Sequence, residues 1–374
     1  MLKFLYNFIS SPKIFVYTVL WLMILVFFGT LAQKDIGLYA SQMKYFSSHI
    51  FLFYDYIPLP GGRVTLLLMT LNLSSSLFRK TLWKIKKIGV IILHIGGLLL
   101  LLGGGVTAIF SSEGNMVIEE GGKVDYTDDY HRMELCFVNL SLQDSLEYTV
   151  FDEELLVEGN TISYDKLGLE IDIISRIKNT RIQNRITEVD SVYKGFLKQF
   201  VLLPKEPEKE NTQNRPSLIF RIRGSKNNAD GIYGLFLGQK DLDIFNFKNE
   251  KFFSEFRKER TYLPFSIELL DFKKVLHPGT QVAKSFSSEI NLIENEIPRR
   301  VLIQMNEPLR HMGYTFFQAS FIEELKSEST VLAVVKNYGR LFPYISSIIM
   351  SIGLLVHLII NLPKMIKKNN SIKA

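Results

Sequence analysis

Residues 87–110 read KIGVIILHIGGLLLLLGGGVTAIF, and no residue from Ile88 to Phe110 is charged. A helix rises about 1.5 Å per residue, so this stretch is long enough to cross the hydrocarbon core of a bilayer, which is about 30 Å thick. One imidazole, that of His94, lies in its first third. Because ionisable side chains at membrane depth usually serve a function, the stretch predicts both a membrane protein and a candidate site.

Apolar segments elsewhere complete a predicted helical bundle. We expect four transmembrane helices, at about residues 14–32, 63–78, 88–110 and 342–362. Segment 63–78 is short for a full crossing and contains Asn72, so it is the weakest of the set. Segment 14–32 is too long for the apolar core of a signal peptide, and we expect it to be retained as an anchor.

Short basic segments next to the apolar ones predict the topology. RKTLWKIKK at 79–87 and KMIKKNNSIK at 364–373 contain no acidic residue, and such segments stay in the cytoplasm. Both chain ends are therefore predicted to be cytoplasmic, with residues 111–338 outside an inner (plasma) membrane. A three-span protein with a cytosolic domain would place two basic segments on the wrong side. The net charge of +6 lies largely beside the apolar segments, so it indicates membrane topology and no nucleic-acid partner.

The remaining residues divide the chain into three parts. We expect residues 1–110 to form three transmembrane helices, residues 111–338 an extracytoplasmic domain, and residues 339–374 the fourth helix with a basic tail. Within 111–338, alternating and β-branched runs separated by Gly, Pro, Asn and Asp predict strands. The expected fold is an α-helical bundle of four transmembrane helices carrying a large, mainly-β, sandwich-like domain.

Two histidines form the candidate site. Residues 343–363, PYISSIIMSIGLLVHLIINLP, contain His357. In antiparallel helices, His94 and His357 would each lie about 9 Å from the inner interface. Haem iron needs only two axial protein ligands, whereas zinc needs three or four, and no HxxxH or HExxH spacing exists. We therefore predict His94 as an axial ligand of haem b and His357 as a second candidate, although a partner subunit could equally supply that ligand. A hydrogen-bonding role in helix packing is the alternative for either histidine.

Glycines near His94 support the same interpretation. Gly97 and Gly104 are seven residues apart and would let a flat macrocycle approach the helix backbone closely, although ordinary helix packing accounts for glycines equally well. The other candidate residues carry no assigned role: His49 lies in an aromatic cluster expected at the membrane interface, and the rest are His131, His277, His311 and Cys136. The single cysteine excludes an intrachain disulfide and a CxxCH haem attachment in this chain. No catalytic constellation is present, so any chemistry belongs to a cofactor or a partner.

Five strings, in their order along the chain, resemble the ResB (CcsB-like) family of system II cytochrome c biogenesis. They are FGTLAQ at 28–33, HIGGLLLLLGG at 94–104, EGNMVIEEG at 113–121, PGTQVAKSFSSEINL at 278–292 and MNEPLRHMGYTFFQASF at 305–321. FGTLAQ lacks the proline that is often found in the family's version of this string.

The resemblance implies a haem-handling subunit of a cytochrome c synthase. Such proteins pair with a CcsA-like membrane subunit that carries a tryptophan-rich haem-binding segment, and together they move haem outward and present it to the thiols of apocytochrome c. His94 matches the family's axial histidine. Because this chain has only Trp21 and Trp83, the tryptophan-rich segment belongs to another chain. The resemblance thus implies an accessory subunit of a lyase-type complex, not an enzyme alone. Two alternatives remain open: a b-type haem electron carrier, and a cofactor-free membrane anchor for an assembly domain.

Overall fold

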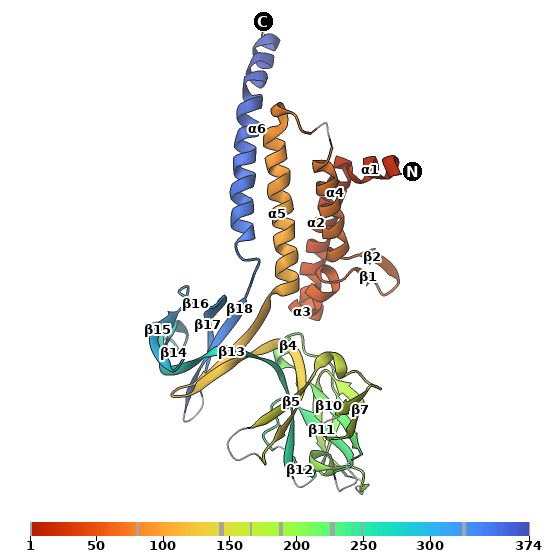
Figure 1. The fold of residues 1–374 in the computed structure, drawn as a ribbon, viewed down its shortest axis with the longest axis vertical. Helices are drawn as coiled ribbons and strands as arrows, with labels where there is room; N and C mark the ends of the chain where they lie inside the picture. Colours follow the sequence, from red (N-terminus) through yellow and green to blue (C-terminus); the bar gives the residue numbers. More distant parts are fainter. Residues whose placement is uncertain are drawn as a thin grey trace. The chain divides into compact units, whose positions relative to one another are not determined.

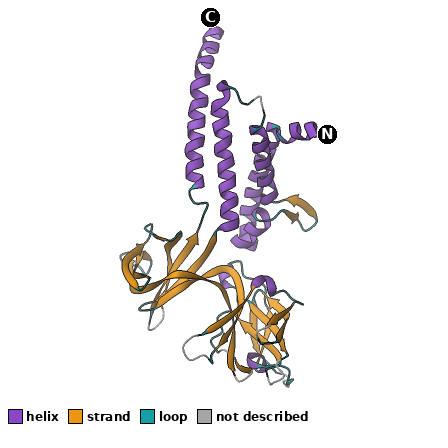
Figure 2. Cartoon of the chain, in the orientation of Figure 1, coloured by secondary structure: helices purple, strands orange, loops and turns teal. Residues whose placement is uncertain are grey.

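The computed structural model describes residues 2–79, 82–141, 146–164, 167–186, 190–224, 229–241, 243–247, 250–323 and 327–373. Residues 80 and 81 of the predicted basic segment 79–87 lie outside this part of the chain. The structure divides into a helical unit, residues 1–112 with 336–374, and a β unit, residues 113–335. Helices dominate the first unit and strands the second, as Figure 2 shows by colour.

The helical unit contains the expected apolar helices. Within the described residues, three helical segments are long and apolar enough to cross a membrane: Pro12–Ile36, Ile85–Phe110 and Phe342–Pro363. The predicted segment 63–78 forms a helix of only 16 residues, about 24 Å long, so a fourth crossing stays a prediction. The elements of this unit are α1 (Leu2–Ile9), α2 (Pro12–Ile36), α3 (Leu38–Ser41), the π-helix η1 (Gln42–Phe46), β1 (Ile50–Phe53), β2 (Ile57–Pro60), α4 (Gly62–Leu77), the 3-10 helix η2 (Ile85–Lys87), α5 (Ile88–Phe110) and α6 (Phe342–Lys373).

Asn72 is buried in the helical unit because it caps a turn. Its side-chain nitrogen donates to the carbonyl oxygens of Ile9 and Ser11, at 2.5 and 2.9 Å. The Ile9 carbonyl lies at the end of α1 and would otherwise lack a helical partner, whereas the Ser11 carbonyl also accepts from the nitrogen of Ile14 at 3.1 Å. The polar residue that weakens α4 as a membrane span therefore fastens α4 to the start of α2.

Helices α5 and α6 lie side by side (Figure 1) and pack along what we call the glycine seam, formed by Gly89, Gly96 and Gly103 of α5. A Cβ atom built on Gly89 would lie 2.5 Å from the backbone nitrogen of His357, and one on Gly96 would lie 2.6 Å from Cγ of Met350. The three glycines are seven residues apart, so they share one face of α5. Only hydrogen at these positions permits the observed approach of the two helices.

The β unit is built on three sheets. The largest has ten strands in the order β15-β14-β13-β4-β3-β18-β17-β16, with β12 paired to β13 and β5 to β4. A second sheet has the order β11-β10-β7-β6, and β8 pairs with β9. The strands are β3 (Ser112–Glu119), β4 (Lys123–Asn139), β5 (Glu147–Asp152), β6 (Thr161–Tyr164), β7 (Leu169–Ile177), β8 (Thr180–Asn184), β9 (Phe200–Pro204), β10 (Ser217–Arg223), β11 (Gly231–Phe236), β12 (Ile244–Phe247), β13 (Glu250–Leu276), β14 (Ala283–Glu294), β15 (Ile297–Gln304), β16 (Leu309–His311), β17 (Tyr314–Glu323) and β18 (Glu328–Lys336).

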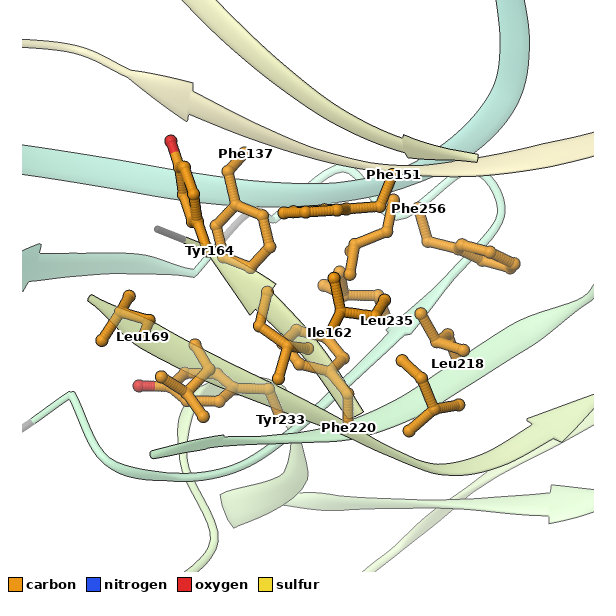
Figure 3. Close-up of a cluster of buried hydrophobic side chains, with 14 of the residues drawn as sticks. Phe137, Phe151, Ile162, Tyr164, Leu169, Leu218, Phe220, Tyr233, Leu235 and Phe256 are labelled. Atoms are coloured by element: carbon orange, nitrogen blue, oxygen red, sulfur yellow. The ribbon is translucent and has the colours of Figure 1, made fainter. Parts of the chain in front are cut away.

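Two separate hydrophobic cores lie within the β unit. The first gathers aromatic and aliphatic side chains of β4–β7 and β10–β13, including Phe137, Phe220 and Tyr233 (Figure 3). The second lies between β3 and the strands from the later half of β13 onward, around Ile267 and Phe316. Strands β4 and β13 pass from one core to the other. The mainly-β character expected from the sequence is confirmed.

The glycine seam gives a direct test of the helix packing. Gly89→Ala should lower the free energy of unfolding by about 1–3 kcal/mol, because the new methyl group meets backbone atoms of α6 that cannot rotate away. Gly105→Ala is the matched control, since nothing lies within 4 Å of a Cβ at that position. The control should be neutral or slightly stabilising. Thermal unfolding of the detergent-solubilised full chain measures both, and an equal response of the two variants would contradict the seam.

Candidate functional site

His94 is oriented by its own helix. The ring nitrogen Nδ1 lies 2.8 Å from the carbonyl oxygen of Val90, one turn earlier in α5. A carbonyl only accepts, so Nδ1 carries a proton and donates it. In the neutral form of the ring, the lone pair is then on Nε2. Within the described part of the chain, no group forms a hydrogen bond with Nε2. A neutral imidazole with one nitrogen bonded to a carbonyl and the other free is the usual form of a metal-ligating histidine.

The face of α5 that carries His94 points away from α6. Two residues of helix separate His94 from Gly96 of the glycine seam, a rotation of about 200°. Gly97 lies on the His94 side, where its Cβ would be 3.6 Å from Cδ1 of Leu73 in α4. Gly104 is exposed, with nothing within 4 Å of a Cβ. His94, Gly97 and Gly104 thus form a strip, which we call the α5 strip. Helix α4 borders it at Gly97, His94 is partly buried and Gly104 is exposed.

His357 lies elsewhere. Its backbone packs against Gly89, five residues before His94 in α5 and therefore about 7.5 Å lower along the helix. Its side chain lies beside Asn361, whose Nδ2 is 3.3 Å from each ring nitrogen and donates to the His357 carbonyl at 2.9 Å. Among the described residues, the His357 ring has its hydrogen-bonding contacts with Asn361 and none with His94. His357 as the second axial ligand stays a prediction, and this geometry does not favour it.

The glycines predicted from the sequence are neighbours of those that pack most tightly. Gly97 and Gly104 were expected to allow close approach, but Gly97 makes only an ordinary contact and Gly104 is open. The close helix contacts occur one residue earlier, at Gly96 and Gly103, which have the same spacing of seven residues. Gly89 was not predicted to take part, although its spacing of seven residues from Gly96 was a visible signal.

The remaining histidines are dispersed. His49 and His277 are exposed. In the β unit, Nδ1 of His131 is 2.8 Å from Nδ2 of Asn211, and burial lowers the pKa of His131. His311 packs edge-on against Phe265. Among the described residues, no group of three or more His, Cys, Asp or Glu side chains could hold a metal ion.

A charged cluster that the sequence did not reveal lies between the two cores of the β unit. Arg257 donates through Nε to Glu134 at 2.7 Å and through Nη1 to Glu255 at 3.2 Å, and the side chains of Arg257 and Glu134 are only 5% and 3% exposed. The pairing of β13 with β4 shifts register next to it, between Lys258 and Arg260. We call this cluster the waist, because the two cores meet there along β4 and β13.

A cavity of about 190 Å³ adjoins the waist. Asp128, Glu255, Arg257 and Arg260 line it, together with residues that follow β11. Arg260 stacks 4.1 Å from the ring centre of Tyr126 and lies 3.3 Å from Asp128. Burial raises the pKa of Asp128, and the nearby Arg260 opposes that rise. The cluster is a self-compensated ion-pair network, which explains how such charged residues are accommodated between apolar cores.

Comparison with known proteins bears on the β unit. A model of the ResB-like family matches residues 238–329. This match supports the resemblance to the ResB family that the sequence strings indicate. Protein NrfI of Wolinella succinogenes is 28% identical to this chain over 99 residues, which are 26% of the chain and 11% of NrfI. The chain thus spans about a tenth of the length of that relative. The family match includes the strings at 278–292 and 305–321 and the Arg257 part of the waist, whereas His94 lies outside it.

The buried ion pair of the waist should make a large contribution to stability. Glu134→Ala leaves Arg257 buried without its main partner, which should lower the free energy of unfolding by about 3–5 kcal/mol. The control is Glu154→Ala, which removes an exposed pair with Arg132 at 3.7 Å and should cost less than about 1 kcal/mol. Unfolding of the full chain followed by circular dichroism of the strands measures both. Similar losses for the two variants would contradict the assignment.

Cys136 should be chemically inert while the protein is folded. Its side chain is fully buried, and burial raises the pKa of the thiol to about 11. Because only the thiolate reacts, iodoacetamide at pH 8 should leave Cys136 unmodified in the native chain and alkylate it after unfolding in guanidinium. Mass spectrometry reads the result. Complete alkylation of the native chain within minutes would show that the thiol is accessible and ionised.

Proposed function

We propose that this ResB-like chain is a membrane subunit of cytochrome c biogenesis that binds haem through His94 and relays it, with a CcsA-like partner, for covalent attachment to apocytochrome c. The observation that carries the proposal is the orientation of His94: Nδ1 is bonded to Val90 and Nε2 is free. The family match supports the biogenesis role. Haem is the cargo of this process, and the chain acts as an accessory subunit of the synthase.

The proposal includes a location. Three apolar helices are compatible with a membrane protein, and the basic segments at 79–87 and 364–373 favour cytoplasmic chain ends. The β unit would then lie outside the inner membrane, where apocytochrome c receives its haem. We include α4 as a fourth, short crossing, whose inner end Asn72 fastens to the start of α2.

The residues of the α5 strip fit a flat iron-bearing ligand. Nε2 of His94 offers the lone pair, the Val90 carbonyl fixes the tautomer, and the exposed Gly104 leaves room beside the backbone. When bound, haem would supply an iron centre with one axial position for His94. Because the His357 backbone packs at the level of Gly89, the second axial ligand is proposed to come from the partner subunit, which would also cover the strip.

An electron carrier with a haem between His94 and His357 is the main rival. It needs both rings on opposite sides of one iron atom, whereas the His357 backbone packs at the level of Gly89, about 7.5 Å along α5 from His94. The geometry therefore favours the relay over this rival.

The decisive test compares two histidine variants in the intact complex. The chain, its CcsA-like partner and a reporter cytochrome c are produced in cells that lack their own pathway. His94→Ala should abolish most reporter maturation and remove haem from the purified complex, as measured by the pyridine haemochrome spectrum. His357→Ala is the matched control and should retain haem and activity, since both changes remove one imidazole from an apolar helix.

Each alternative outcome would point to a different function. Equal loss in both variants would favour the electron carrier. Haem-free wild-type complex under mild detergent, with normal maturation, would favour a cofactor-free anchor. Full maturation by His94→Ala would refute the ligand assignment.

A further inference from the structure

Strands β1 and β2 form a hairpin between α2 and α4 that nothing in the proposed haem relay uses. They pair antiparallel with Phe53 opposite Ile57, and Tyr54, Asp55 and Tyr56 form the loop. Figure 1 shows the hairpin extending sideways from α2 and α4, near the end of the bundle at which α3 lies. Among residues 50–60, IFLFYDYIPLP, Asp55 is the only charged one.

The hairpin exposes an unusual amount of apolar surface. Tyr56 is 87% exposed and Tyr54 is 78% exposed, and Ile50, Leu52 and Ile57 are also exposed. An isolated two-stranded hairpin is at best marginally stable in water, and exposed apolar patches of this kind mark contact with a membrane or a partner. We therefore expect an apolar environment around this hairpin.

The base of the hairpin is fixed to α2. Phe51 is buried with Tyr45 and Leu25, and Nε1 of Trp21 donates to the carbonyl oxygen of Pro60 at 2.9 Å. Farther along the hairpin, the ring of Phe53 packs edge-on against Phe28, with centres 5.8 Å apart. The hairpin thus holds a set position instead of moving as a free loop.

Proline removes the backbone donors from the outer edge of β2. The nitrogen of Gly61 donates to the carbonyl of His49 at 2.8 Å, so residues 49 and 61 form a hydrogen-bonded pair. Such pairs alternate with pairs whose backbone groups point outward, and Pro58 and Pro60 occupy the outward positions. Neither has an N–H, and the outward oxygen of Pro60 is bonded to Trp21. This edge can therefore lie against lipid without unsatisfied donors.

Contacts with α2 give the depth of the hairpin. Trp21 lies nine residues after Pro12, about 14 Å along α2, and Phe28 lies about 24 Å along it. The hairpin therefore rises along α2 from its base towards the tyrosine loop, away from the end that starts at Pro12.

We infer that the β1–β2 hairpin is a lipid anchor, which lies in the outer membrane–water interface with its aliphatic side chains among the first acyl carbons and Tyr54 and Tyr56 at the headgroups. Tyrosine is one of the residues that membrane–water interfaces favour. The inference rests on the membrane location proposed above and is independent of haem. The anchor would hold the outer half of α2 and the start of α4 at a set depth.

Spin labels on single cysteines test the anchor in the full chain reconstituted into liposomes. In a Cys136→Ala background, Tyr56→Cys reports on the hairpin, Ile24→Cys on the exposed side of α2, and Ile186→Cys on the β unit. Collision rates with oxygen and with a water-soluble nickel chelate are measured for each. Label 56 should collide with oxygen several-fold more than label 186, and with nickel several-fold more than label 24.

The controls separate the two levels of the inference. If label 24 meets nickel as readily as label 186, the membrane location itself is wrong. If label 24 is shielded from nickel, the membrane location stands. In that case the anchor alone is refuted if the collision rates of label 56 equal those of label 186, equal those of label 24, or are low for both reagents.

A second measurement keeps Cys136. The tryptophan fluorescence of Tyr56→Trp, after subtraction of the wild-type signal, should be quenched more by lipids brominated near the headgroup than by lipids brominated near the chain end. Tyr262→Trp in the β unit should respond to neither, and stronger quenching of residue 56 by the deep bromines would overturn the interfacial position.

Discussion

The contact between α5 and α6 decides what the helical unit can do. Three glycines spaced seven residues apart let the two backbones approach closely. Only their face of α5 can therefore lie against α6, which fixes the rotation of α5 about its axis. With that face committed to α6, His94 lies on the other side of α5, where Gly97 borders Leu73 of α4. The seam thus separates a structural face of α5 from a candidate binding face, which we propose a partner completes.

The β unit poses a different physical problem. Strand β13 runs for 27 residues and contributes to two hydrophobic cores, so it crosses a region where neither core covers it. The waist fills that region with ion pairs, of which Glu134–Arg257 is buried. Breaking one partner leaves a buried charge, whereas the intact network is compensated. The joint between the cores is therefore held by directional contacts that fix the relation of the strands.

Much of the fold follows from composition and period, whereas the site does not. The apolar helices could be located because an uncharged run of about 20 residues is the hallmark of a membrane-spanning helix. The pairing of His94 with His357 stays a prediction. The level of His357 relative to α5 could not be inferred from the sequence, because it depends on how the helices pack, with the His357 backbone against Gly89. The side of the bundle that His94 faces could not be inferred from residue spacing either, since it depends on which glycines contact α6.

Polar residues within β13 and α4 gave local signals that differed from the structure. The run RKER within β13 interrupts strand alternation, so the length of β13 and the waist could not be inferred from the sequence. Asn72 looked unfavourable in α4 because its partners, two carbonyls at the turn before α2, are distant in the sequence. In each instance, tertiary contacts overrode a local signal.

The measurement that bears most directly on haem binding is a density map of the chain with its partner and haem, prepared in lipid. We predict the haem iron at bonding distance from Nε2 of His94, the Nδ1 hydrogen bond to Val90 retained, and the second axial ligand supplied by the partner. A map in which the His94 ring faces lipid, or in which the porphyrin lies between α5 and α6 on His357, would contradict the role of the α5 strip.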